Sequence, residues 1–245
     1  MRLIGKLGKR APRLDGRTLR LAMYLPCLPP APASIDWSGK VTDWTQLLND
    51  SLGDCTIAAA GHLITTWTAA NGVQHTPLDL DILTAYEQAC GYNPSDPNSD
   101  QGGVELDVLK YWQQTGIGLD KIGPYLALNP KNENHVRSAV QLFGGAYIGL
   151  SLPVSCQDQD VWDVVSGPQG ESGSWGGHAV CVVGYNEVGP VCVTWGATKQ
   201  MTWAFWLAYC DEAYAILSPD WDVNGVAPSG FDGEALRVDL AALAA

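Results

Sequence analysis

The stretch Asn49-Asp-Ser-Leu-Gly-Asp-Cys55-Thr-Ile-Ala-Ala-Ala-Gly-His-Leu-Ile-Thr-Thr-Trp67 joins a polar loop to a run of small and apolar residues. The run has helical character, and its small side chains allow other elements to approach closely on all sides. Asp54 precedes the run as an N-cap candidate, which places Cys55 in the first turn of a central helix. The helix dipole favours the thiolate form of a cysteine there. The stretch therefore predicts that Cys55 is a candidate nucleophile.

A thiolate nucleophile needs an imidazole close by, and the chain has four histidines. His178 follows two glycines at the start of a strand-like segment, where its side chain can project into a cleft. His62 lies two helical turns after Cys55, out of hydrogen-bond reach, and is interpreted as a satisfied core or surface histidine. His75 and His135 lie in polar segments and are expected to be exposed. A Cys and a His far apart in sequence can both be structural residues, so this pair needs support from its surroundings.

The apolar spacing changes from helical to strand-like near residue 145. Helices are predicted over residues 79–89, 104–115 and 133–142, and buried strands over 146–152, 179–185 and 190–194. The proline-rich residues 25–33 exclude a helix or central strand and predict an extended connector. The chain is therefore predicted to be α+β, with a basic N-terminal arm and connector at 1–33, a helical domain at 34–128 and a β-rich domain at 129–245.

The composition excludes several classes of protein. With 245 residues, of which 46% are hydrophobic, the chain can bury a large core and is not disordered. No apolar run approaches the roughly 20 residues of a membrane helix, and no N-terminal block reads as a secretory signal. The seven cysteines include no C-x-x-C pair and no zinc-like cluster with histidine. We therefore expect a cytoplasmic or particle-associated protein with no metal, cofactor or membrane partner.

The charge is divided unevenly along the chain. The net charge is −12, yet residues 1–33 carry about +6 and the remainder about −18. This asymmetry predicts either an arm folded on the acidic body or an arm that contacts an acidic partner. Nucleic acid is an unlikely partner, because no aromatic residues interleave the basic ones and the acidic body would repel phosphate.

Several short motifs occur in one collinear order between residue 34 and about residue 216. They are Asp36-Trp37, Gly53-Asp-Cys55, Gly102-Gly103, Gly177-His-Ala-Val-Cys-Val-Val-Gly-Tyr185 and Thr194-Trp-Gly196. In order and spacing this set resembles the papain-like cysteine peptidases. The resemblance implies a helical domain with a long central helix, packed on a β-barrel-like domain with the active-site cleft between them.

The resemblance also implies a role for each matching residue. Cys55 would be the nucleophile and His178 the base and later the acid, while Asn49 and the Cys55 backbone N–H would bind the oxyanion. Trp195 would shield the base from water. Gly102 and Gly103 would line the cleft that binds a peptide or protein substrate.

Two departures from the family pattern concern catalysis. The asparagine that orients the histidine in the family falls at Val193, which offers no side-chain hydrogen bond. Thr194 is the possible replacement, because a one-residue slip in strand register reverses which side chain faces the cleft. Asn49 is one methylene shorter than the family's glutamine, which affects its reach toward an oxyanion.

Two functions are consistent with this sequence. The first is a thiol-dependent peptidase, or a related amide hydrolase or acyl transferase, with a Cys-His dyad. The alternative is a catalytically weak or inactive papain-fold protein that binds within a larger assembly, such as a phage particle, through its basic arm.

Overall fold

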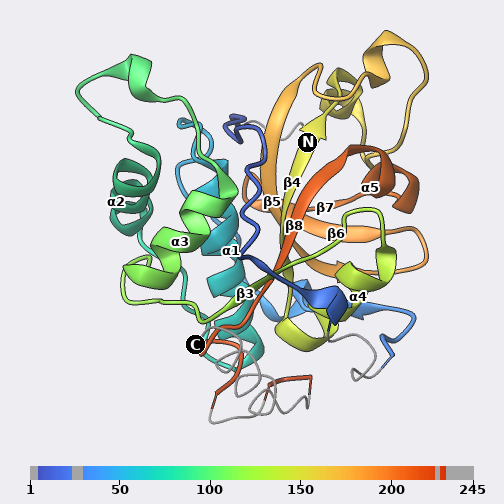
Figure 1. The fold of residues 1–245 in the computed structure, drawn as a ribbon, viewed down its shortest axis with the longest axis horizontal. Helices are drawn as coiled ribbons and strands as arrows, with labels where there is room; N and C mark the ends of the chain where they lie inside the picture. Colours follow the sequence, from blue (N-terminus) through green and yellow to red (C-terminus); the bar gives the residue numbers. More distant parts are fainter. Residues whose placement is uncertain (1–4, 24–29, 224–226, 230–245) are drawn as a thin grey trace.

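The computed structural model describes residues 5–23, 30–223 and 227–229. Helix α1 (Cys55–Ala70) lies between the sheet and the other helices of the first half of the chain (Figure 1). All its residues except Thr68 and Ala70 are buried, as its small side chains predict. Close packing depends on Gly61, where a Cβ would lie 2.6 Å from the Leu47 side chain. The central helix predicted from the sequence is therefore confirmed, and it begins at Cys55.

The remaining helices cover the two faces of the sheet. They are α2 (Asp79–Cys90), α3 (Glu105–Gln114), α4 (Glu133–Phe143) and α5 (Trp203–Tyr209). Helices α2 and α3 pack with α1 on one side, and α4 and α5 pack on the other side of the sheet (Figure 1). The predicted helices agree with α2, α3 and α4 to within one residue at each end.

The described strands form one open sheet in the order β1-β3-β8-β4-β5-β6-β7, with β2 paired to β5. They are β1 (Leu19–Arg20), β2 (Ile35–Asp36), β3 (Tyr125–Ala127), β4 (Ala146–Leu152), β5 (Gly176–Tyr185), β6 (Pro190–Thr194), β7 (Ala197–Gln200) and β8 (Cys210–Ile216). The α+β class is confirmed, but the sheet does not close into a barrel. The two-residue strand β1 and the four-residue strand β7 end the path at opposite edges without pairing.

Alternation along the strands divides the core in two. Cys181 and Val193 are register partners, and both pack in the core around α1. Val182 and Cys192 are also partners, and both pack in the core on the other face. This alternation fixes which residues near the end of β6 face α1.

The N-terminal arm belongs to the sheet as well as to the surface. Strand β1 pairs in parallel with β3, and Leu21 just after it is fully buried. Residues before β1, drawn in blue in Figure 1, run between the helices on one side and β4, β5 and β8 on the other. Strands of the sheet thus come from all three of the predicted segments. Most of the proline-rich connector, including Cys27, lies outside the described residues.

Within the described ranges, no helix combines the length and the apolar character needed to cross a membrane.

Candidate active site

Cys55 is the first residue of α1 and is fully buried. The Ala179 backbone N–H donates to its sulfur at 3.4 Å, and the Gly8 backbone amide is near enough to lower the pKa of the thiol. Asp54 occupies the N-cap position, but its side chain makes no capping hydrogen bond. Burial raises the pKa of Cys55 to about 12, more than the two backbone amides lower it. In this arrangement the thiol is protonated and shielded, although its position suits a nucleophile.

His178 lies on β5, directly before the residue whose N–H contacts the Cys55 sulfur. Its Nε2 atom is 2.6 Å from the Thr194 hydroxyl oxygen. Its Nδ1 atom is buried and has no hydrogen-bond partner among the described residues. Trp195 stacks on the imidazole, with ring centroids 4.6 Å apart and planes inclined by 22°. Burial lowers the pKa of His178 to about 3, so the ring is neutral.

The register of β6 explains why the hydroxyl at Thr194 meets the histidine. Val193 opposes Cys181 and points into the core around α1. The next side chain, Thr194, points to the other face and reaches Nε2 of His178. The structure thus places Thr194 beside the imidazole and Val193 away from it.

The other histidines lie outside this cluster. His62 is buried and its Nε2 hydrogen-bonds the Thr45 carbonyl oxygen at 2.8 Å, which confirms it as a satisfied core residue. His75 is half exposed and pairs with Asp120. His135, expected to be exposed, is buried, because its Nδ1 accepts a hydrogen bond from the Asn129 backbone N–H at 2.9 Å.

The arm occupies the space in front of Cys55. Gly103 N–H donates to the Gly8 carbonyl oxygen at 2.8 Å, and Arg10 N–H donates to the Gly103 carbonyl oxygen at 2.8 Å. On the opposite side, Lys9 N–H donates to the Gly177 carbonyl oxygen at 3.1 Å. The arm therefore bridges the glycine pair of the helical half to the strand that carries His178, and it fills the cleft between them.

The fit of the arm depends on glycine at positions where backbones nearly touch. A Cβ on Gly8 would lie 1.7 Å from the Gly53 carbonyl oxygen, and a Cβ on Gly102 would lie 1.7 Å from the Gly8 carbonyl oxygen. Gly102 also has a φ of 72°, which disfavours other residues. No side chain can be added at either position without separating the arm from the body.

The backbone of the arm passes the thiol at Gly8. The Cys55 sulfur meets the Gly8 amide, while the Gly8 carbonyl oxygen is directed at Gly103. Trp195 Nε1–H donates to the Lys6 carbonyl oxygen at 3.2 Å. Attack on a peptide requires its carbonyl carbon near the sulfur and its oxygen at the oxyanion donors. The carbonyl groups of Lys6 and Gly8 are thus held by other partners, and the arm covers the thiol.

No family model matches the chain, and no curated protein sequence matches it significantly. Solved structures do match it. Xylellain, a cysteine protease from Xylella fastidiosa, has a TM-score of 0.67 at 15% identity, covering 89% of this chain and 97% of its own. A cysteine protease from Carica candamarcensis, solved in complex with E-64, has a TM-score of 0.54 at 15% identity, covering 76% of this chain and 98% of its own. Procathepsin B from Trypanosoma congolense has a TM-score of 0.55 at 12% identity, covering 89% of this chain and 87% of its own.

The chain has the papain-like fold. At these identities the similarity concerns the fold alone, so the chemical roles of individual residues depend on the geometry described above. The resemblance seen in the sequence motifs and the match to solved cysteine proteases agree with each other. In this fold Cys55 begins α1 and His178 lies on β5.

Asn49 lies in the loop before α1 and is buried. Its side-chain nitrogen donates to the Leu52 carbonyl oxygen at 3.0 Å, and its backbone carbonyl accepts the Lys6 N–H at 2.7 Å. One of its two side-chain N–H groups is thus held within its own loop. A second amide, not considered from the sequence, belongs to Gln46, which packs against Gly196. Of the two residues, Gln46 has the longer side chain.

Three carboxyl groups beside the cleft were also not predicted from the sequence to be site residues. Lys9 Nζ lies 2.9 Å from Asp211 Oδ1 and 3.1 Å from Glu212 Oε1. The charge of the buried Glu105 also raises the pKa of Lys9. The available signal was the opposite charge of arm and body, which indicated contact but not its location. In the described part of the chain, no group of three or more His, Cys, Asp or Glu residues is arranged to hold a metal ion.

Proposed function

We propose that the protein is a thiol-dependent peptidase that its own N-terminal arm keeps inactive. The observation that supports this most is the joint placement of Cys55 at the start of α1 and His178 on β5, with Thr194 bound to the imidazole. The arm covers the thiol, and its Gly8 carbonyl oxygen accepts a hydrogen bond from Gly103 N–H. Peptide hydrolysis then requires residues 5–10 to leave the cleft.

Once the cleft is open, the dyad has the groups that amide hydrolysis needs. The Cys55 thiol transfers its proton to Nδ1 of His178, and the thiolate attacks the peptide carbonyl carbon. The Cys55 backbone N–H and the Asn49 amide stabilise the resulting oxyanion. The imidazolium returns the proton to the leaving amine, which breaks the C–N bond and leaves a thioester. Water, deprotonated by His178, hydrolyses the thioester and restores the thiol.

The proposal is tested with a full-length variant in which the arm cannot dock. We expect Gly8→Val to cleave unstructured peptides, because its Cβ displaces the arm from the Gly53 carbonyl oxygen. Adding Cys55→Ala should reduce turnover to background. The measurement is peptide cleavage followed by mass spectrometry. A freely reactive Cys55 without any turnover would instead favour the papain-fold binding protein.

Thr194 is proposed as a positioning residue that holds the imidazole through Nε2. In the Gly8→Val background, Thr194→Val should lower kcat about 10-fold with KM nearly unchanged, corresponding to about 1.4 kcal/mol. The reason is that the neutral ring loses the partner that fixes its tautomer and orientation. Thr194→Ser should restore kcat, since it keeps the hydroxyl. A full kcat in Thr194→Val, or no recovery with serine, would remove this role.

A further inference from the structure

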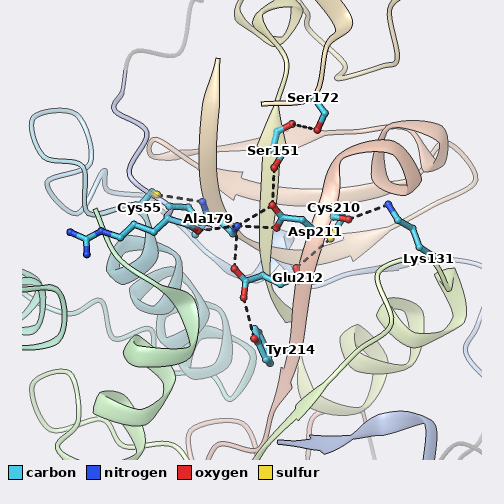
Figure 2. Close-up of polar contacts among 11 residues, drawn as sticks. Cys55, Lys131, Ser151, Ser172, Ala179, Cys210, Asp211, Glu212 and Tyr214 are labelled. Atoms are coloured by element: carbon cyan, nitrogen blue, oxygen red, sulfur yellow. Dashed lines mark hydrogen bonds and ion pairs between the residues drawn. The ribbon is translucent and has the colours of Figure 1, made fainter. Parts of the chain in front are cut away.

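The side chain of Lys9 lies in a closed acidic pocket at one end of the cleft. Only 1% of the side chain is exposed, although lysine is rarely buried. Its ammonium contacts Asp211 and Glu212, which are themselves held by hydrogen bonds from other residues. Ser151 Oγ donates to Asp211 at 2.8 Å, and Tyr214 donates to Glu212 at 3.1 Å. Figure 2 shows Asp211 and Glu212, which lie on β8, with their partners Ser151 and Tyr214.

A third carboxyl group completes the pocket. Glu105, at the start of α3, is fully buried, and neither of its oxygens has a hydrogen-bond partner among the described residues. Burial raises the pKa of Glu105, the Glu212 carboxylate raises it further, and the Lys9 ammonium lowers it. Burial alone would lower the pKa of Lys9, but the three carboxyl groups raise it above its ordinary value. The Lys9 ammonium thus favours the ionised form of the carboxyl groups, and the carboxyl groups favour the charged form of Lys9.

The shape of the pocket also suits an unbranched cationic side chain. Gly149 on β4 forms its wall, and a Cβ there would lie 1.9 Å from Lys9 Cε. Asp211, Glu212 and the Arg10 carbonyl oxygen surround Nζ at 2.9–3.3 Å. Three acceptors around one nitrogen match the three N–H donors of an ammonium group. A narrow slot that ends in carboxylates is a lysine site in both shape and charge.

We propose that this pocket, formed by Glu105, Gly149, Asp211 and Glu212, is a subsite that selects a lysine side chain of the substrate. Lys9 of the arm occupies it in place of the substrate. When the arm leaves, the carboxylates lose their counter-ion, and a buried charge without a partner is strongly unfavourable. A lysine-bearing peptide restores the ion pairs, whereas a neutral side chain does not. This inference specifies the substrate class of the peptidase proposed above.

The test measures binding, so that it does not depend on turnover. The full chain carrying Gly8→Val and Cys55→Ser is titrated with fluorescent peptides in which lysine is placed at one position at a time. Matched peptides carry norleucine or acetyl-lysine at the same position. We expect one lysine position to bind at least about 10-fold more tightly than both neutral analogues, equivalent to about 1.4 kcal/mol. Equal affinity for lysine and norleucine at every position would overturn the proposal.

Variants of the pocket separate this site from general attraction to an acidic protein. Adding Asp211→Asn and Glu212→Gln should remove the preference for lysine, while Glu187→Gln, an exposed carboxylate outside the cleft, should leave it unchanged. If all three variants lose affinity equally, the attraction is nonspecific and the subsite is rejected. Lys9→Met, studied at pH 8 where the carboxylates disfavour an apolar side chain, provides a second way to vacate the pocket if Gly8→Val does not fold. A peptide that binds with lysine preference but is never cleaved by the Cys55 protein would leave the subsite standing and reject the peptidase.

Discussion

Replacing Gly8 by valine should increase the rate of Cys55 alkylation about 1,000-fold at pH 7. In the native protein the sulfur is fully buried beneath the arm, and burial raises the pKa of Cys55 to about 12. A Cβ at Gly8 would lie 1.7 Å from the Gly53 carbonyl oxygen and less than 3 Å from two further Gly53 backbone atoms. Backbone atoms at the end of the loop before α1 have little freedom to move, so the arm must separate from the cleft.

The size of the effect follows from the arm's anchoring. In the native protein, alkylation requires residues 5–10 to open, which breaks four backbone hydrogen bonds to Asn49, Gly103 and Gly177 and exposes the Lys9 ion pairs. An opening free energy of about 4 kcal/mol gives the 1,000-fold protection. Strand β1 and the buried Leu21 keep the later part of the arm attached in the variant. The body is therefore expected to remain folded while the thiol becomes accessible.

The measurement is the rate of modification by iodoacetamide, with the modified cysteine mapped by mass spectrometry. Gly16→Val is the matched control, because a Cβ at Gly16 meets no atom within 4 Å. It should alkylate at the native rate. If Gly8→Val is protected as well as the native protein, the arm is not what covers Cys55. Circular dichroism of both variants checks that the fold is retained.

The elements that carry Cys55 and His178 could be predicted because their signals are local. The small and apolar residues after Cys55 specify a helix that is buried all round, and the apolar run that follows His178 specifies a buried strand. The contact between Thr194 and His178 could be predicted only as an alternative to a contact from position 193. Whether Thr194 or Val193 faces His178 depends on the register between β5 and β6, which no local pattern fixes.

The covering of the active site could not be predicted in the same way. Residues 5–10 form no helix and contribute only an isolated bridge, Lys9 to Gly103, so they carry no periodicity. Their contacts are backbone hydrogen bonds to partners far along the chain, which the sequence does not encode locally. The helix terminus predicted that Cys55 favours the thiolate form, and this prediction was wrong because a distant segment buries the thiol. The helix terminus is present, but burial by a distant segment has the larger effect on the pKa.

The acidic pocket illustrates the same limit for charged residues. Glu105 is on α3, whereas Asp211 and Glu212 are on β8. From the sequence alone, each would be predicted to be an exposed charge on the surface of its helix or strand. Only the tertiary fold brings them around one ammonium group. The charge asymmetry between arm and body indicated an attraction, and the fold determines that it is concentrated on Lys9 in the cleft.

Replacing Lys9 by methionine should open the cleft to an extent that increases with pH. The Lys9 ammonium lowers the pKa values of Glu105 and Glu212, which burial already holds above their ordinary value of 4.5. Without the ammonium these pKa values rise further in the docked state, while the open state is unchanged. A docked variant therefore binds more protons than the docked native protein over the range above pH 4.5. By linkage, the cost of docking a methionine grows as pH rises through that range.

The observable is the ratio of Cys55 alkylation rates, Lys9→Met over native, measured from pH 5 to pH 8. Taking the ratio cancels the titration of the thiol itself, because the open states of the two proteins share the same Cys55 environment. At the lower end of this range more of the Glu105 and Glu212 carboxyl groups are protonated and accept the apolar side chain, so the ratio should be small. Toward pH 8 more of them would be ionised without a cation, and the ratio should be about 30-fold higher, equivalent to about 2 kcal/mol. Lys6→Met is the matched control, since Lys6 pairs with Asp100 at a site where its own side chain is half exposed, and its ratio should stay flat. A flat ratio for Lys9→Met would mean that the carboxyl groups are not held ionised by Lys9, and the electrostatic account of arm docking would fail.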